Sequence, residues 1–398
     1  MAIGEFAFNL FDDEVRRDPY PWYDKLRGVG RVVRNPALFG TLMVHRHADV
    51  LAILRDPARF SSADPGGMQD RPRVFNGVPT MLTSDPPVHE RLRGVLSRAF
   101  TPRTVARLEP RLREIARGLV DPLQDGAVVD ACDALAAPLP VIAIAELMGV
   151  SASDRDSFRQ WSDDLIGGTP ELATPEAVDR AREAGENLRA YFRAEIARRR
   201  ASAVATDDLV GRLVAANEGD VLDDDELLAS CVLLLVAGNE TTTNLIANMT
   251  LALARQIDQR RRLVVDPTMV PGAVEEAVRY DAPVQATVRT AKTAVGVGGE
   301  TINEGERVFV LLAAANRDPD EFPDPDRFDV GRGSTTHLGF GHGVHFCLGA
   351  GLARLEARVA CEALLAVAPE FSLADPSAVL DYGPSFIFHR PLHVPIVA

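Results

Sequence analysis

The sequence Gly339-Phe-Gly-His-Gly-Val-His-Phe-Cys-Leu-Gly-Ala-Gly351 sets a single cysteine just before a helical segment. The apolar residues of segment 352–365 recur at the spacing of an amphipathic helix. A cysteine at the mouth of a helix is favoured as the thiolate, since backbone N–H groups and the helix dipole stabilise the anion. Two glycines ahead of Cys347 allow a tight turn with positive φ.

The residues around Cys347 suit a sulfur that is shielded from water. Gly349 leaves space for a flat ligand to lie against the start of the helix. Phe340 and Phe346 are placed to shield the sulfur. A shielded thiolate with backbone donors suits an axial ligand of iron.

On the residues alone, three other interpretations of this segment compete with an iron ligand, and the last of them fails. His342, His345 and Cys347 make a partial zinc site, but no second Cys/His cluster supplies a fourth ligand. A nucleophilic Cys347 would use His345 as its base, provided that the loop brings the two side chains together. A dinucleotide-binding loop needs G-x-G-x-x-G after a strand, whereas these glycines give G-x-G-x-G with no strand leading in.

Upstream, residues 223–255 predict one long helix with a weak, polar centre. Asp223, Asp224 and Asp225 suit its N-terminus, where carboxylates meet the positive end of the dipole. At about 1.5 Å per residue the helix is roughly 50 Å long, enough to cross a domain. Its middle reads Ala237-Gly-Asn-Glu-Thr-Thr-Thr-Asn244, and Gly and Thr are poor helix formers. Such a centre is kinked, faces something polar, or forms a satisfied buried hydrogen-bond cluster.

The rest of the chain is mainly helical with short strands. Helical spacing covers residues 103–123 and 175–200, and strand-like pieces cluster in residues 31–44 and 287–310. The sequence has no internal repeat, low-complexity tail or flexible linker. We therefore expect a single domain over residues 1–398.

The composition disfavours several classes of protein. A net charge of −14 argues against nucleic acid and anionic membrane as general partners. No apolar run approaches the roughly 18 residues that span a bilayer, and the N-terminus lacks a basic segment followed by an apolar one. Cys132, Cys231 and Cys361 form no C-x-x-C pair and are expected to be buried thiols. These features predict a cytoplasmic protein.

The run Phe340-x-x-Gly343-x-His345-x-Cys347-x-Gly349 resembles the haem-binding loop of the cytochrome P-450 family. Further segments match motifs of that family in the same order, so the resemblance spans nearly the whole chain. They are Ala237-Gly-Asn-Glu-Thr-Thr242 of the oxygen-activating helix, Glu276-Ala-Val-Arg279, Pro325-Asp-Arg-Phe328 of the meander and, as in the soluble bacterial branch, Asp18-Pro-Tyr-Pro21 and Asp85-Pro-Pro-Val-His-Glu-Arg-Leu-Arg93. The cysteine loop is a strong motif by itself, whereas E-x-x-R is a weak one.

The resemblance implies a mainly α fold with small β-sheets, in which a haem lies between the long central helix and the helix of the cysteine loop. Cys347 would be the axial ligand of the iron of haem b, where a thiolate favours O–O cleavage. The other implied haem contacts are four groups for the propionates, His89, Arg93, Arg289 and His345, and four residues near the ring, Phe340, Gly343, Gly349 and Ala237.

The same resemblance assigns oxygen activation to Thr241 and Glu240. The Thr241 hydroxyl would hydrogen-bond dioxygen and hold a water, and the Glu240 carboxylate would relay protons inward. Many relatives have aspartate where this chain has Glu240. Glu276, Arg279 and Arg327 would form a buried salt-bridge network that supports the haem side of the fold.

The implied function is a monooxygenase that inserts one oxygen atom from dioxygen, its co-substrate, into a hydrophobic small molecule. Candidate substrates are a steroid, terpenoid, fatty acid or polyketide-like compound. The mostly apolar pocket would draw on residues 62–82, 234–238, 284–286 and 386–388.

The electron donors implied are ferredoxin and ferredoxin reductase, with NAD(P)H as the ultimate donor, because no flavin, iron–sulfur or nucleotide-binding motif occurs. Arg98 and Arg354 are candidate docking residues, and we expect a monomer. A peroxide-driven peroxygenase and a non-catalytic haem-binding sensor or carrier are the alternatives. The presence of Glu240 and Thr241 disfavours both.

Overall fold

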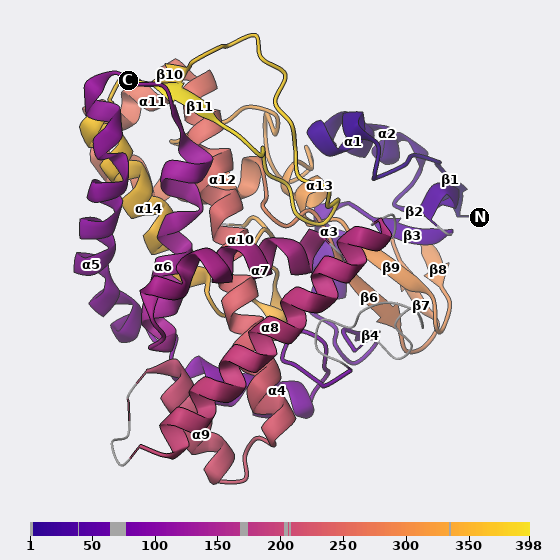
Figure 1. The fold of residues 1–398 in the computed structure, drawn as a ribbon. Helices are drawn as coiled ribbons and strands as arrows, with labels where there is room; N and C mark the ends of the chain where they lie inside the picture. The colour runs from indigo at the N-terminus through magenta and orange to yellow at the C-terminus, as the bar shows by residue number, and fades with distance from the viewer. Residues whose placement is uncertain are drawn as a thin grey trace.

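The computed structural model describes residues 3–38, 40–63, 77–167, 174–202, 206, 208–333 and 336–398. Helices make up most of this part of the chain, and most strands gather to one side of the helical body (Figure 1). The mainly α fold with small β-sheets is confirmed.

In the described residues the helices are α1 (Asp13–Arg17), α2 (Tyr20–Val29), α3 (His47–Leu54), α4 (Val88–Ser97), α5 (Pro102–Val120), α6 (Pro138–Met148), α7 (Arg155–Gly167), α8 (Pro175–Arg200), α9 (Leu209–Glu218), α10 (Asp224–Arg255), α11 (Ile257–Val265), α12 (Val270–Tyr280), α13 (Leu312–Asn316) and α14 (Ala350–Val367). The strands are β1 (Gly4–Glu5), β2 (Val32–Asn35), β3 (Thr41–Val44), β4 (Phe60–Ser61), β5 (Val129–Asp130), β6 (Thr287–Ala291), β7 (Val295–Val297), β8 (Glu300–Ile302), β9 (Arg307–Val310), β10 (Ser372–Leu373) and β11 (Pro395–Val397).

The long helix α10 begins where the acidic run predicts. Asp223 is its N-cap and accepts a hydrogen bond from the backbone N–H of Glu226 at 2.7 Å, while the Glu226 side chain accepts from the N–H of Asp223 at 3.2 Å. This reciprocal capping box satisfies two donors that a helix start leaves free. The helix continues through Gly238 without interruption, so the predicted helix is confirmed.

The helical core is built around α10, which packs against α6, α7, α8, α12 and α14. The apolar run 232–235 is at most 5% exposed at each position. Burying one such side chain stabilises a fold by about 1.5–3 kcal/mol. A second helix pair, α14 on α5, extends this core and fixes the helix that follows the cysteine loop.

Strands β2 and β3 of the first predicted cluster and β6 and β9 of the second lie in one sheet, whose strand order is β1-β2-β3-β9-β6-β4, whereas β7 and β8 pair separately with each other. Strand β3 runs parallel to β9, with Val44 opposite Val310, and β6 runs antiparallel to β9, with Thr287 opposite Val310. A separate sheet of order β10-β11-β5 joins the C-terminus to residues 129–130, and the sequence did not predict it.

A buried ion-pair network joins α12 to the meander before the cysteine loop. Glu276 and Arg279, 2% and 0% exposed, pair at 2.7 Å, and Arg332 Nε donates to both Glu276 oxygens at 3.1 and 3.2 Å. The prediction that the Arg327 side chain completes this network is wrong, because that side chain is 61% exposed. The backbone oxygen of Arg327 takes part instead, accepting from Arg279 at 3.0 Å and from Arg332 at 2.9 Å.

Candidate active site

A cavity of about 280 Å³ lies between α10 and the cysteine loop, and its lining is mostly apolar. Of the site residues predicted from the sequence, its lining includes Ala237, Thr241, Arg93, Arg289, Phe340, His345, Cys347 and Gly349. Glu240, His89 and Gly343 are not among the lining residues. The structure thus brings most of the predicted residues to one cavity.

The fold of the cysteine loop holds Cys347 at the cavity wall. The backbone N–H of Cys347 donates to the carbonyl of Phe340 at 2.8 Å, which closes the loop. Gly341 and Gly343 both have φ of 69°, a conformation that L side chains rarely adopt. A Cβ on Gly343 would lie 2.5 Å from the backbone oxygen of Leu54. The predicted positive-φ turn is confirmed, and Gly343 acts by letting the loop pass close to α3.

The helix start acts on the Cys347 sulfur but does not outweigh burial. Burial raises the pKa of the Cys347 thiol, while the backbone N–H groups of Gly349 and Ala350 and the charge of Arg93 lower it. The start of α14 therefore lowers the pKa of the thiol as expected, but burial raises it more. A coordinated metal ion deprotonates a thiol outright, so this sulfur suits a metal ligand better than a free nucleophile.

Four basic side chains, His89, Arg93, Arg289 and His345, lie at or beside the cavity, and none forms an ion pair with the residues that the structure describes. The rings of His89 and His345 are 4.3 Å apart between centroids. Within the described chain, both ring nitrogens of His89 and Nε2 of His345 are buried without a hydrogen-bond partner.

Burial disfavours the charged forms of Arg289 and His345 in this cluster. Arg289 is 7% exposed, and burial lowers its pKa to about 10. Burial, and then the charge of Arg289, lowers the pKa of His345 to about 3. Buried charges and unpaired polar atoms are costly unless a partner meets them. The cluster therefore fits an anionic group in the cavity, and the propionates of a haem have that charge.

Thr241 presents its hydroxyl to the cavity from the middle of α10. Its Oγ1 donates to the carbonyl of Ala237 at 2.8 Å, so the side chain satisfies a backbone oxygen one turn earlier. Both residues belong to the cavity lining. The polar centre of the helix therefore borders a mostly apolar cavity at Thr241, whose hydroxyl is satisfied by the helix backbone.

Glu240 lies beside Thr241 in the sequence but meets a different set of groups. Its carboxylate is 8% exposed, and Oε1 lies 3.4 Å from Arg390 Nε. Burial raises the pKa of Glu240 to about 7, Arg390 opposes that rise, and the neighbouring carboxyl of Asp163 adds to it. The sequence reasoning missed Asp163 and Arg390, because no local pattern links α7, α10 and the C-terminal loop.

The substrate side of the cavity agrees in part with the prediction. Met81, Leu82, Leu234 and Val284 line the cavity, whereas the segment 386–388 does not. Phe386 packs its ring against Phe11 and Phe309 instead. Residues 64–76 of the predicted pocket segment 62–82 lie outside the described residues.

Comparison with known proteins places the chain in a family. A family model described as Cytochrome P450 matches residues 173–376. Cytochrome P450 107B1 of Saccharopolyspora erythraea is 42% identical over 391 residues, which cover 94% of each chain. The chain belongs to the cytochrome P450 family. Vitamin D(3) 25-hydroxylase of Pseudonocardia autotrophica is 40% identical over 379 residues, covering 94% of this chain and 92% of that protein.

Solved structures agree with this assignment. The myxobacterial cytochrome P450 CYP267B1 in complex with myristic acid matches this P450 with a TM-score of 0.88 and 39% identity, over 98% of both chains. CalO2 matches with a TM-score of 0.90 and 33% identity, also over 98% of both chains. The predicted cytochrome P-450 fold is thereby confirmed.

As a cytochrome P450, the chain is a haem enzyme that inserts one oxygen atom from dioxygen into a hydrophobic small molecule. Its relatives carry names such as Erythromycin C-12 hydroxylase and Mycinamicin IV hydroxylase/epoxidase. None of the described helices is both long enough and apolar enough to cross a bilayer.

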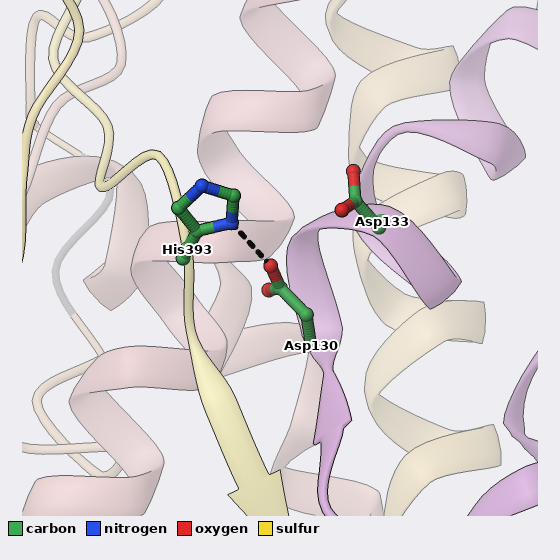
Figure 2. A group of neighbouring side chains, drawn as sticks. All are labelled: Asp130, Asp133 and His393. Atoms are coloured by element: carbon green, nitrogen blue, oxygen red, sulfur yellow. Dashed lines mark hydrogen bonds and ion pairs between the residues drawn. The ribbon is translucent and has the colours of Figure 1, made fainter.

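The zinc interpretation of the cysteine loop finds no support in this P450. In the part of the chain that the structure describes, one group of side chains has the spacing of metal ligands: Asp130, Asp133 and His393 (Figure 2). His393 Nδ1 is bonded to Asp130 at 2.5 Å, and Asp133 accepts from Arg159 at 2.6 Å. These contacts hold β5 beside the C-terminal strand, so the group has protein partners already. His342 of the cysteine loop accepts from Arg55 at 3.0 Å.

Proposed function

We propose that this cytochrome P450 holds haem b through Cys347 and uses Thr241 and Glu240 to activate dioxygen. The single observation that carries the proposal is that Cys347 and Thr241 line the same apolar cavity, one from the cysteine loop and one from α10. The haem, when bound, supplies the iron at which dioxygen is reduced. The overall reaction converts substrate R–H, dioxygen, two electrons and two protons into R–OH and water.

The residues at the cavity wall would hold the cofactor by charge and by shape. Arg93 and Arg289 would pair with the propionates, and His89 and His345 would donate through ring nitrogens that have no partner among the described residues. Hydrogen bonds between charged groups are the stronger kind. A Cβ on Gly349 would meet no atom within 4 Å, so a flat ring has room against the start of α14.

Two neighbouring residues of α10 would have different roles in the activation of dioxygen. Thr241 places its hydroxyl in the cavity, where it can orient dioxygen or a water by hydrogen bonds. Glu240 can both hold and release a proton near neutral pH, because burial raises its pKa to about 7. A proton donor is most effective when its pKa lies near the operating pH.

The substrate would be an apolar compound of the steroid, terpenoid, fatty-acid or polyketide type. Apolar side chains such as Met81, Leu234 and Val284 form the wall of the cavity away from the basic cluster. Ligand sites of this kind bind mainly through buried apolar surface. The relatives' names point to the same range: a vitamin D3 hydroxylase, macrolide hydroxylases and a complex with myristic acid.

Ferredoxin and its reductase would deliver electrons from NAD(P)H to a monomeric, cytoplasmic, single-domain enzyme. Of the two docking residues suggested by the sequence, Arg354 already pairs with Glu275 at 2.6 Å. Arg98 remains a candidate for that contact.

The experiment is turnover with ferredoxin, its reductase and NADPH, using labelled dioxygen and a panel of steroids, fatty acids and macrolides. Compounds that shift the haem from low to high spin are selected first. One labelled oxygen atom in the product supports the proposal. Product formed only with hydrogen peroxide would instead establish a peroxygenase, and haem binding without any product would establish a sensor or carrier.

A further inference from the structure

Two carboxyl groups from different helices meet at one guanidinium beside the cavity. Arg390 Nε lies 3.4 Å from Glu240 Oε1, and Arg390 Nη2 lies 3.8 Å from Asp163 Oδ1. The two carboxyl groups also act on each other's pKa, which places them close together. At such a distance one proton can bridge the two groups, because a protonated carboxyl donates a hydrogen bond and a carboxylate accepts one.

The charges of the three groups lead to the same conclusion. Two ionised carboxylates and one guanidinium would leave a net negative charge in a site where Glu240 is 8% and Arg390 is 13% exposed. One bound proton makes the group neutral. Like charges this close cannot both ionise without raising one pKa strongly, and burial disfavours the charged forms further.

We propose that Asp163 is the second member of the proton-delivery site, sharing one proton with Glu240 under the charge of Arg390. This inference rests on the proposed role of Glu240 as proton donor. Asp163 touches neither substrate nor cofactor, so it is a positioning and proton-holding residue. The site thereby joins α7, which packs across α10 (Figure 1), to the oxygen-activating helix.

The two carboxyl groups differ in exposure, and this difference indicates the direction of proton transfer. The Asp163 side chain is 37% exposed, that of Glu240 is 8% exposed, and Thr241 follows in the cavity lining. When Glu240 gives its proton to the cavity, the pair is left with two negative charges against one positive charge. It then takes one proton from solvent through Asp163, so each proton delivered is replaced by one proton taken up.

Other charged and polar groups also lie around the pair. Arg159 Nε lies 3.9 Å from Asp163, and its Nη2 donates to Asp133 at 2.6 Å. The remaining neighbours that act on the pair are Asp164 on α7 and Asn244 on α10. Arg159 and Arg390 both lower the pKa of Asp163, but burial raises it more. Burial thus favours a bound proton on the pair.

The first test compares Asp163→Asn with Asp163→Glu and Asp164→Asn. Without the Asp163 charge, Glu240 faces Arg390 alone, so we expect the pH midpoint of coupling (product per NADPH) to fall by about 1–3 units. Glutamate at 163 should restore most of the wild-type profile. Asp164 pairs with Arg180 at 3.6 Å and accepts from Gln160 at 2.9 Å, and it acts on Asp163 more weakly than burial and Arg390 do, so its amide variant serves as the matched control and should shift the midpoint less than Asp163→Asn.

The second test needs no turnover. At neutral pH the infrared spectrum of the holoenzyme should contain a protonated-carboxyl band that both Asp163→Asn and Glu240→Gln remove, because each leaves a single carboxylate beside Arg390. Glu356 is fully buried, burial raises its pKa well above the ordinary value, and its band should persist as an internal reference.

The outcomes separate this inference from the function on which it rests. If Asp163→Asn keeps the band and the wild-type pH midpoint while Glu240→Gln loses coupling, Glu240 delivers protons without Asp163 and the inference is wrong. Loss of coupling at every pH with no change of midpoint would show a structural role only, and would also overturn it. Full coupling in Glu240→Gln would refute the proposed role of Glu240 itself.

Discussion

Arg354 donates two hydrogen bonds, of 2.6 and 2.8 Å, to the carboxylate of Glu275. The contact joins α14 to α12, and His337 adds a third contact to the same carboxylate at 3.1 Å. It also holds the Arg354 guanidinium 4.5 Å from the centre of the Phe340 ring, beside the cysteine loop. A carboxylate on α12 thus fixes the loop that carries the sulfur.

Glu275→Gln should remove a pH-dependent part of the stability. Burial alone would raise the pKa of Glu275, but the contacts with Arg354 and His337 outweigh burial and lower it from 4.5 to about 2. A group with a lowered folded pKa stabilises the fold above its unfolded pKa and loses that effect as the pH falls through the folded value. The contribution is about 3 kcal/mol at pH 7.

Urea unfolding of the wild type and Glu275→Gln, followed from pH 7 downward, measures this contribution. The difference in unfolding free energy should shrink between about pH 5 and pH 2. Glu362→Gln is a suitable control, because Glu362, a partly exposed carboxylate of α14, pairs with Arg113 of α5 and not with Arg354. A difference for Glu275→Gln that stays constant over this range would contradict the assignment.

Arg332→Ala should destabilise the fold more than Arg327→Ala. The Arg332 side chain is 12% exposed and meets both oxygens of Glu276, whereas that of Arg327 is 61% exposed. Losing hydrogen bonds to a buried carboxylate lowers the unfolding free energy by about 1.5–3 kcal/mol. Replacing an exposed arginine changes it by no more than about 0.5 kcal/mol. Chemical denaturation of the two variants decides between them, and equal losses would show that the exposed arginine matters as well.

The sequence predicts the parts of this P450 whose signals are local. Residues 223–255 predict α10 because the acidic start and the apolar periodicity lie within that segment. The motif that contains Arg327 indicates the meander. It does not show that Arg332 pairs with Glu276, because sequence spacing does not determine which arginine contacts a given carboxylate. Asp163 and Arg390 escape prediction for the same reason: they meet Glu240 only through the packing of distant segments.

Arg289→Ala should release haem faster without weakening the protein that lacks haem. Arg289 is 7% exposed and has no ion pair with the described residues, so its buried charge destabilises the protein until an anion binds. Losing one charged hydrogen bond of about 1.5–3 kcal/mol corresponds to about tenfold to a hundredfold faster haem loss. Transfer of haem to apomyoglobin measures the rate.

Two variants control for that result. Arg289→Lys keeps the charge and should lie between the wild type and alanine. Arg307→Ala removes an exposed arginine of the neighbouring strand β9 and should leave haem loss unchanged. Wild-type haem retention in Arg289→Ala would remove this residue from the proposed propionate contacts.

Thr241→Ala should keep the haem spectrum but divert electrons to hydrogen peroxide. The variant loses the hydroxyl in the cavity lining, whereas the cysteine loop and basic cluster stay intact. We expect product per NADPH to fall by about tenfold or more, with peroxide rising to match. Thr243→Ala is the matched control, because the Thr243 hydroxyl is buried outside the lining and lies 3.4 Å from Asn239 Oδ1. Full coupling in Thr241→Ala would exclude its proposed role.

Cys347→Ala should abolish the red-shifted absorption band of the reduced carbon monoxide adduct. That band reports a thiolate opposite the carbon monoxide, and Cys347 is the cysteine in the cavity lining. Cys361→Ala is the control: Cys361 is buried on α14 away from the cavity lining, where burial raises its pKa to about 12. Its variant should keep the band. A red-shifted band that survives in Cys347→Ala would mean that another group binds the iron, and the roles of Thr241 and the basic cluster would have to be derived again around that ligand.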